Sequence, residues 1–182
     1  MKTLSLLIIL SLPACLLIAQ QPGYKTLRSS IKLIAVEGDE TYQWENTDNT
    51  VFLDYKTGDF KVRLTNRDFY NPLHPEPEDP DLDEEEREFL LQGMLPINDI
   101  INQKNTSQNY QVELQLICDA LRMNETIQFD MKITKPGSSS QSYRIFVLKG
   151  ILYNDQLKLP FFEGFDNEIE MLINFNGIFE GN

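Results

Sequence analysis

The sequence predicts an all-β fold, an antiparallel meander of about eight strands that forms a barrel or a two-sheet sandwich. One or two short helices are expected near residues 82–102. Three observations lead to this prediction. Apolar and polar residues alternate with a period of two through much of the chain, and short turn-forming segments separate the alternating stretches. The sequence also lacks the succession of strands and long helices that indicates a parallel α/β sheet.

The clearest strand is predicted over 110–118 (YQVELQLIC), where every second residue is apolar. Such alternation is typical of a strand with one buried face, because successive side chains point to opposite sides. Segments 127–133 and 168–175 repeat the pattern. Five further candidates complete the meander, at 31–36, 50–55, 59–65, 142–153 and 157–159. Both architectures show this alternation, so it does not choose between a barrel and a sandwich.

The long candidate at 142–153 is apolar on both faces, which predicts a covered outer face and a bulge at Gly150. Turn-forming residues at 56–59 and 136–140 place hairpins between neighbouring strands. A two-residue turn is expected at 154–155.

The middle of the chain interrupts the meander. Residues 70–80 carry four prolines, which excludes an interior strand. Residues 81–93 (DLDEEEREFLLQG) then predict a short helix, with acidic residues in the first turn and a glycine at its end. The expected acidic, proline-rich loop and short helix therefore occupy about 70–92. A second short helix is expected over 96–102, with Ile97, Ile100 and Ile101 facing the core.

The first residues have the pattern of a secretory signal, predicted over 1–19. Lys2 precedes a nearly unbroken apolar run at 4–12, which is too short to span a membrane. Cleavage after Ala19 would leave a single β domain over 20–182. Alternatively, residues 12–15 (LPAC) resemble a bacterial lipobox that would anchor a lipoprotein through Cys15. Either route predicts an exported protein of the periplasm or cell envelope, without a membrane span.

Composition excludes several classes of function. The chain has 16 Lys and Arg against 28 Asp and Glu, a net charge of −12. Such a surface argues against nucleic-acid partners and anionic membrane surfaces. His74 is the only histidine and lies between prolines, which disfavours a zinc site or a Ser-His-Asp arrangement. No catalytic motif occurs, so the sequence predicts a protein that is not an enzyme and needs no cofactor or metal.

Three remaining features are interpreted as structural rather than functional. Asp79, Asp81 and Asp83 have the opening spacing of a calcium loop, but Glu84 replaces the glycine that an EF-hand requires. A solvated acidic loop is the preferred interpretation, and weak calcium binding is the alternative. Cys118 lies in an apolar alternation, as a small buried side chain does. Trp44, the sole tryptophan, is expected in the core rather than on a sugar-stacking surface.

The order of elements resembles the YceI-like envelope proteins. These are lipocalin-like barrels that hold a polyisoprenoid or another long-chain apolar molecule. The resemblance covers about residues 30–179 and includes an Arg67-Asp68 pair before the mid-chain helix, a long central hairpin over 142–159 and a closing strand over 167–179. It implies an apolar ligand. The His-Gly-Val-Thr-type segment of the central hairpin is missing, so no binding residue is carried over.

Two functions follow as hypotheses. The first is a barrel that binds a long-chain apolar ligand, isoprenoid-like or lipid-like, among its inward side chains. The second is a sandwich module of a surface complex that binds a protein partner through the acidic loop or a sheet edge. The candidate ligand-lining residues are Val112, Leu114, Leu116, Phe129, Met131, Ile145, Val147, Met171 and Ile173.

Overall fold

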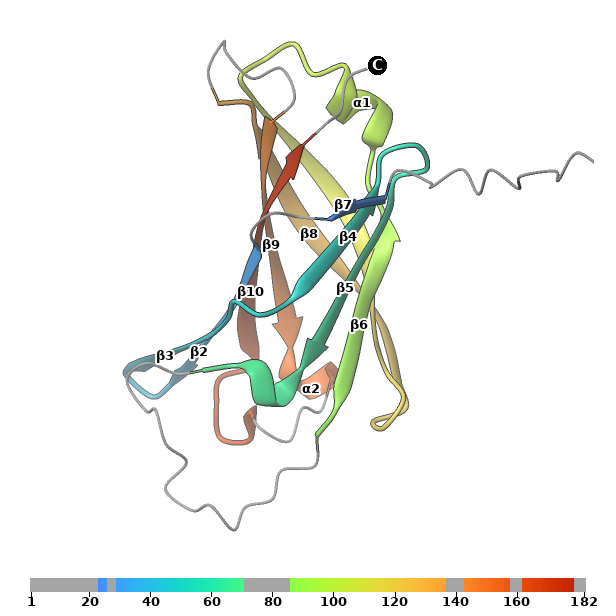
Figure 1. Ribbon diagram of the computed structural model, residues 1–182. Helices are drawn as coiled ribbons and strands as arrows, with labels where there is room; N and C mark the ends of the chain where they lie inside the picture. The colour runs from blue at the N-terminus through green and yellow to red at the C-terminus, as the bar shows by residue number, and fades with distance from the viewer. Residues whose placement is uncertain (1–22, 26–28, 71–85, 137–142, 158–161, 179–182) are drawn as a thin grey trace, which may run out of the picture.

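The computed structural model describes residues 23–25, 29–70, 86–136, 143–157 and 162–178 (Figure 1). Several sequence predictions lie outside these residues. They concern the signal at 1–19 with its two processing routes, most of the proline-rich acidic loop with His74, and the calcium-type spacing at 79–83.

Within the described residues the chain forms ten strands, two short α-helices and one 3-10 turn. The strands are β1 (Gly23–Lys25), β2 (Ser29–Glu37), β3 (Glu40–Asn46), β4 (Thr50–Asp54), β5 (Asp59–Thr65), β6 (Glu88–Met94), β7 (Ser107–Cys118), β8 (Met123–Thr134), β9 (Tyr143–Tyr153) and β10 (Glu168–Ile178). The helices are α1 (Ile97–Ile101) and α2 (Asn154–Leu157), and the 3-10 turn is η1 (Asn66–Asp68).

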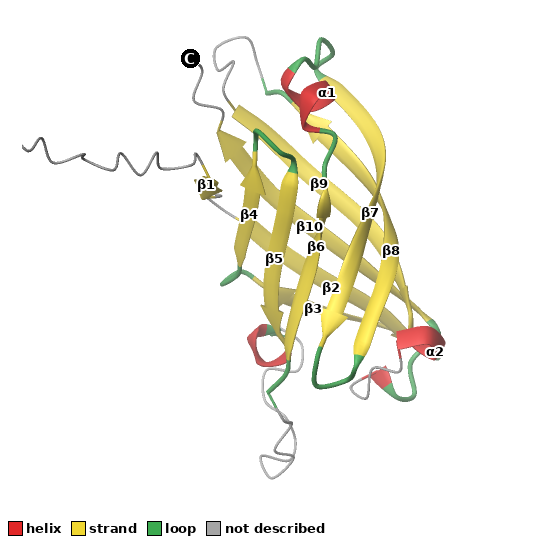
Figure 2. Cartoon of the chain, turned by 90° about the vertical axis from the view of Figure 1, so that its right-hand side faces the viewer, coloured by secondary structure: helices red, strands yellow, loops and turns green. Residues whose placement is uncertain are grey.

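All the strands belong to one antiparallel sheet with the order β1-β4-β5-β6-β7-β8-β9-β10-β2-β3 (Figure 2). The two ends of this order are the two halves of one long hairpin. Gly23 pairs with Asp54 and Ile31 with Asn46, which is the same register in both halves. Because β2 also pairs with β10 and β4 also pairs with β5, the hairpin joins the ends of the sheet.

The sheet therefore closes into a barrel, as one of the two predicted architectures requires, and the sandwich alternative is wrong. Counting each broken strand of the long hairpin once leaves eight positions around the barrel, ten strands minus two. Closure near η1 is completed by a bridge in which the backbones of Glu45 and Tyr70 exchange two hydrogen bonds of 2.9 Å. An eight-stranded barrel has an interior just wide enough for side chains or one small ligand.

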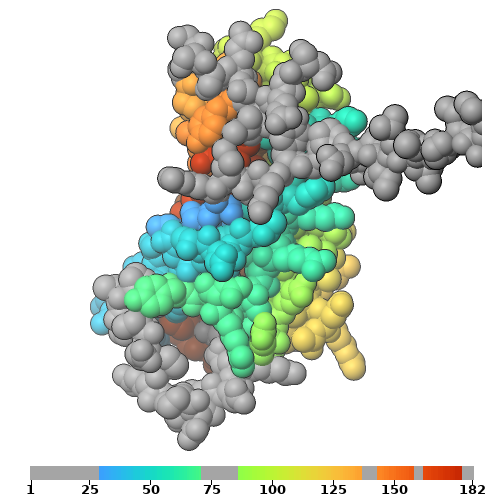
Figure 3. Space-filling model, in the orientation of Figure 1, coloured from blue at the N-terminus to red at the C-terminus, as the bar shows by residue number. Residues whose placement is uncertain are grey.

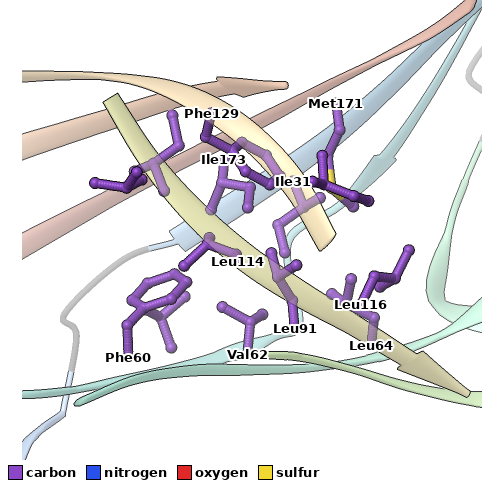
Figure 4. Close-up of a cluster of buried hydrophobic side chains, with 14 of the residues drawn as sticks. Ile31, Phe60, Val62, Leu64, Leu91, Leu114, Leu116, Phe129, Met171 and Ile173 are labelled. Carbon is purple, nitrogen blue, oxygen red and sulfur yellow. The ribbon is translucent and has the colours of Figure 1, made fainter. Parts of the chain in front are cut away.

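Inward side chains from around the barrel fill its middle (Figure 4). Phe146 stacks on Phe175 with ring centroids 4.4 Å apart, and Phe60 lies against Phe175 at 5.6 Å. At the upper end in Figure 1, α1 places Ile97 and Ile100 in the core. The helix predicted over 96–102 is thus confirmed, but Ile101, expected in the core, is exposed.

The helix predicted over 81–93 is wrong where the structure describes it, because residues 88–94 form β6. Phe89 pairs with Leu64 and Leu91 with Val62, and both side chains of β6 are buried. Gly93 does not end a helix. A Cβ there would lie 2.7 Å from Cδ2 of Leu114, so the glycine permits close packing of β6 on β7.

The predicted strand over 142–153 is confirmed as β9, but its expected bulge at Gly150 is wrong. Gly150 pairs in register with Phe129 on one side and Met171 on the other. A Cβ at position 150 would lie 2.7 Å from Cε1 of Phe129, so this glycine leaves space for a phenyl ring. The turn expected at 154–155 is the first half of α2.

Candidate functional site

A cavity of about 240 Å³ lies inside the barrel at the end that carries η1 and α2, the lower end in Figure 1. Apolar side chains and one amide line it. These residues are Leu33, Trp44, Leu64, Asn66, Phe69, Phe89, Leu116, Leu152, Phe162 and Met171. None of them is charged, so the cavity offers an apolar surface with a single polar side chain, as pockets for apolar ligands do.

Strand pairing brings the lining side chains together from distant parts of the sequence. Met171 of β10 pairs with Leu33 of β2, which in turn pairs with Trp44 of β3. Across the barrel Leu64 of β5 pairs with Phe89 of β6. Directly opposite residues in a sheet point to the same face, so the alternation of each strand directs these side chains inward.

Four aromatic rings gather at this end of the barrel, and two of them, Trp44 and Phe162, line the cavity. Trp44 stacks on Tyr42 at 6.0 Å, and it meets Phe162 and Phe165 edge-on at 5.5 Å each. Phe162 is 2% exposed although it lies in the loop that follows α2. Edge-to-face contacts stabilise a particular orientation of the rings, in addition to the stabilisation that burial of the rings provides. We call these four residues the aromatic floor (Tyr42, Trp44, Phe162 and Phe165), and their contacts fix the orientation of its rings.

Hydrogen bonds of the backbone and of two asparagine side chains hold the floor in place. The side-chain amide of Asn154 donates to the carbonyl of Phe162 at 2.8 Å. The N–H of Asp166 donates to the carbonyl of Val36 at 2.7 Å, and the N–H of Asp155 donates to Oδ1 of Asn167 at 2.8 Å. The loop is thus tied both to α2 and to the tip of the β2–β3 hairpin.

The rim of the cavity is formed by Asn66 and Phe69, two lining residues that are only half-buried. Oδ1 of Asn66 accepts a 2.7 Å hydrogen bond from the N–H of Arg87, which fixes the amide at the start of β6. Figure 3 shows the residues of η1 beside β2 and β3 on this part of the surface. The rim thus places one oriented amide beside an apolar interior.

The structure divides the nine predicted lining residues into three groups. Leu116 and Met171 line the cavity. Five others are buried in the core but not among the lining residues: Val112, Leu114, Phe129, Met131 and Ile173. Ile145 and Val147 are half-buried on the outer face of β9, because Phe146 and Leu148 occupy the inward positions. The inward direction expected for these two is therefore wrong.

Sequence reasoning did not select the other residues of the cavity. Trp44 was predicted to belong to the core, and it both packs against the core and lines the cavity. Leu33 and Leu64 lie in predicted strands and could have been chosen from their alternation. Phe162 lies in a loop, where no periodicity identifies an inward residue.

Three further findings concern a thiol, metal binding and membrane spans. Cys118 is 1% exposed, which confirms the prediction of a buried thiol. In the described part of the chain, no cluster of three or more His, Cys, Asp or Glu residues has the geometry to hold a metal ion. No helix of the described residues is long and apolar enough to cross a membrane.

Comparison with solved structures finds the same fold in a polyisoprenoid-binding domain from Saccharophagus degradans that is implicated in plant cell wall breakdown. The alignment covers 85% of this chain and 98% of that chain, with a TM-score of 0.59 and 5% sequence identity. No family model and no curated protein sequence matches the chain. At this identity the likeness establishes the lipocalin-like barrel fold, and function has to be argued from the site.

Proposed function

We propose that this chain is an exported carrier that binds an isoprenoid-like or lipid-like molecule in the cavity of its barrel and catalyses no reaction. The observation that carries the proposal is the cavity itself, about 240 Å³ in volume and lined by ten residues without a charge. The fold neighbour, named as a polyisoprenoid-binding domain, supports an apolar ligand. The signal pattern at 1–19 supports export to the periplasm or envelope.

The size of the cavity sets the portion of ligand that it holds. An engineered cavity of about 150 Å³ holds one benzene. By the same scale, 240 Å³ holds about ten heavy atoms. A longer chain would leave the rest of its length outside the cavity. None of the side chains that line the cavity is charged, and an unpaired carboxylate or phosphate is costly to bury. The hydrocarbon end of the ligand is therefore the end that enters.

Native mass spectrometry of the exported protein, purified from an envelope-exporting host, tests this proposal. Spectra of the native protein are compared with spectra of its organic extract. The proposal predicts one long-chain species at a stoichiometric amount, or its uptake after incubation with lipid. A clean protein mass that does not change after incubation would contradict it and would favour a protein-binding role.

A pair of variants on one strand locates the ligand. Leu116→Phe adds ring atoms inside the cavity, whereas Ile117→Phe adds a similar group on the half-buried outer face of β7. The first variant is expected to lose the ligand while keeping its fold, and the second is expected to keep it. Equal loss in both variants would place the ligand elsewhere.

A further inference from the structure

The barrel wall opens between β8 and β9. The two strands pair only from Phe129–Gly150 to Thr134–Ile145. Below this point β8 stays paired with β7 down to Met123, and β9 stays paired with β10 down to Tyr153. In the described residues no β8–β9 pair occurs along this stretch. Backbone N–H and C=O groups at such edges are available for other partners.

A groove of about 380 Å³ occupies this opening. Residues 125–128 and 130 of β8 and residues 149–153 of β9 line it, so each strand contributes at least four consecutive residues. Consecutive side chains point to opposite faces of a sheet, so a groove that touches all of them follows the strand edges. Gln156 and Leu157 of α2 also line the groove.

The groove adjoins the cavity inside the barrel. Leu152 lines both spaces and is 3% exposed. Ile127 and Leu157, each 6% exposed, are the other buried apolar side chains at the groove. No β8–β9 pair of the described residues crosses this part of the wall, so side chains rather than ladder hydrogen bonds separate the two spaces.

The two spaces differ in chemistry. The cavity is apolar, whereas the groove carries amide and hydroxyl side chains together with the exposed carboxylates of Glu125 and Asp130. Among the described residues, Lys149 is the basic side chain that lines the groove, and it forms an ion pair with Glu170. Nε2 of Gln111 donates to Oδ1 of Asp130 at 3.4 Å, a contact with a neutral amide. The groove therefore favours a cation and repels an anion.

We propose that the β8–β9 groove binds the cationic head of an amphiphile whose hydrocarbon chain enters the cavity beside Leu152. This inference rests on the proposed carrier function and adds the class of the head group and the route of entry. It assigns the head to the side of the barrel rather than to the rim at Asn66.

Three ten-carbon compounds with different heads test the inference: decylamine, decanol and decanoate at neutral pH. The fluorescence of Trp44, the single tryptophan and a lining residue of the cavity, reports binding to the full chain. Decylamine is expected to bind roughly tenfold more tightly than decanoate, because the groove carboxylates attract one head and repel the other. Equal affinities for decylamine and decanoate would overturn the head-group assignment and leave the carrier function intact. No response to any of the three would overturn both.

Paired charge variants locate the head. Glu125→Gln with Asp130→Asn is expected to remove the preference for decylamine over decanoate. Asp39→Asn with Glu163→Gln removes two exposed charges at the same barrel end outside the groove and should keep the preference. Loss of the preference in both double variants would show a general charge effect and overturn the site.

Truncation of Leu152 tests the route. Leu152→Ala removes the side chain shared by the groove and the cavity, so decylamine is expected to associate faster with this variant in stopped-flow fluorescence. An association rate equal to that of the unsubstituted chain would overturn entry beside Leu152.

Discussion

The indole of Trp44 meets the ring of Phe162 edge-on, with centroids 5.5 Å apart and an interplanar angle of 81°. The two residues lie more than a hundred positions apart in the sequence, and both line the cavity. Their contact connects the β3 side of the barrel to the loop before β10. The floor of the cavity therefore depends on an ordered loop as well as on the strands.

Removal of Phe162 should damage both stability and the floor. Phe162→Ala is expected to lower the free energy of unfolding by about 3–5 kcal/mol, because the ring is fully buried. The emission of Trp44 should also shift to longer wavelength as water reaches the indole. Denaturant unfolding and fluorescence spectra measure the two effects. Phe165→Ala is the control, since Phe165 also touches Trp44 but is only half-buried. A smaller stability loss for Phe162→Ala than for Phe165→Ala would contradict this description.

Gly150 should not tolerate a methyl group. In Gly150→Ala the new Cβ would lie 2.7 Å from Phe129, and overpacking of this kind costs about 1–3 kcal/mol. Adding Phe129→Leu removes the opposing ring atoms and should recover part of the loss in a double-mutant cycle. Denaturant midpoints of the three variants measure the coupling. Strict additivity of the two changes would mean that the ring does not set the requirement for glycine.

Asn46 stabilises the point where the long hairpin changes its partner strand. Its side chain is 1% exposed, and its Oδ1 accepts a 3.0 Å hydrogen bond from the N–H of Asp48. Asn46→Ala is expected to cost about 1–3 kcal/mol in unfolding free energy, because it leaves the Asp48 N–H without this acceptor. Thr47→Ala, at an exposed neighbouring position, should change the unfolding free energy little. Similar losses at both positions would argue against this role.

Alkaline pH should weaken the fold through Tyr110. Burial, followed by the negative charge of Asp99, raises the pKa of Tyr110 above its ordinary value of 10.0. The folded state thus holds the phenol proton more tightly than the unfolded state. The resulting stability is complete below pH 10 and is lost as the pH rises through the raised pKa. Tyr110→Phe should therefore show a flatter loss of stability above pH 10 in denaturant titrations. Tyr153→Phe, at an exposed position, serves as control, and equal slopes in Tyr110→Phe and the parent chain would contradict the assignment.

The alternation of apolar and polar residues predicted the strands that bury one face. The alternation in 110–118 and 168–175 corresponds to β7 and β10, and barrel closure keeps their inward residues in the core. The alternation of apolar and polar residues did not distinguish a barrel from a sandwich, because both folds show it. The barrel is distinguished by the register that β1–β4 and β2–β3 share, which joins the two ends of the sheet. This register pairs residues that are distant in the sequence, so no local sequence pattern predicts it.

Two errors have a common physical cause. The acidic start of the segment at 81–93 favours a helix locally, but pairing with β5 and β7 buries Phe89 and Leu91 in a strand. In β9 both faces are apolar, so the pattern does not fix the phase, and a shift of one residue exchanges the faces. The inward set of β9 includes buried Arg144, a residue that hydropathy alone places outside. Tertiary packing overrides local preference in both segments.

Contact between Trp44 and a bound chain is the most direct test of the central claim. A ten-carbon alcohol that carries bromine near the end of its chain quenches a tryptophan only at close range. The cavity assignment predicts saturable quenching of Trp44 in the unsubstituted chain and in Ile117→Phe, and its loss in Leu116→Phe. Quenching that persists in Leu116→Phe, or that never saturates, would contradict binding inside the barrel.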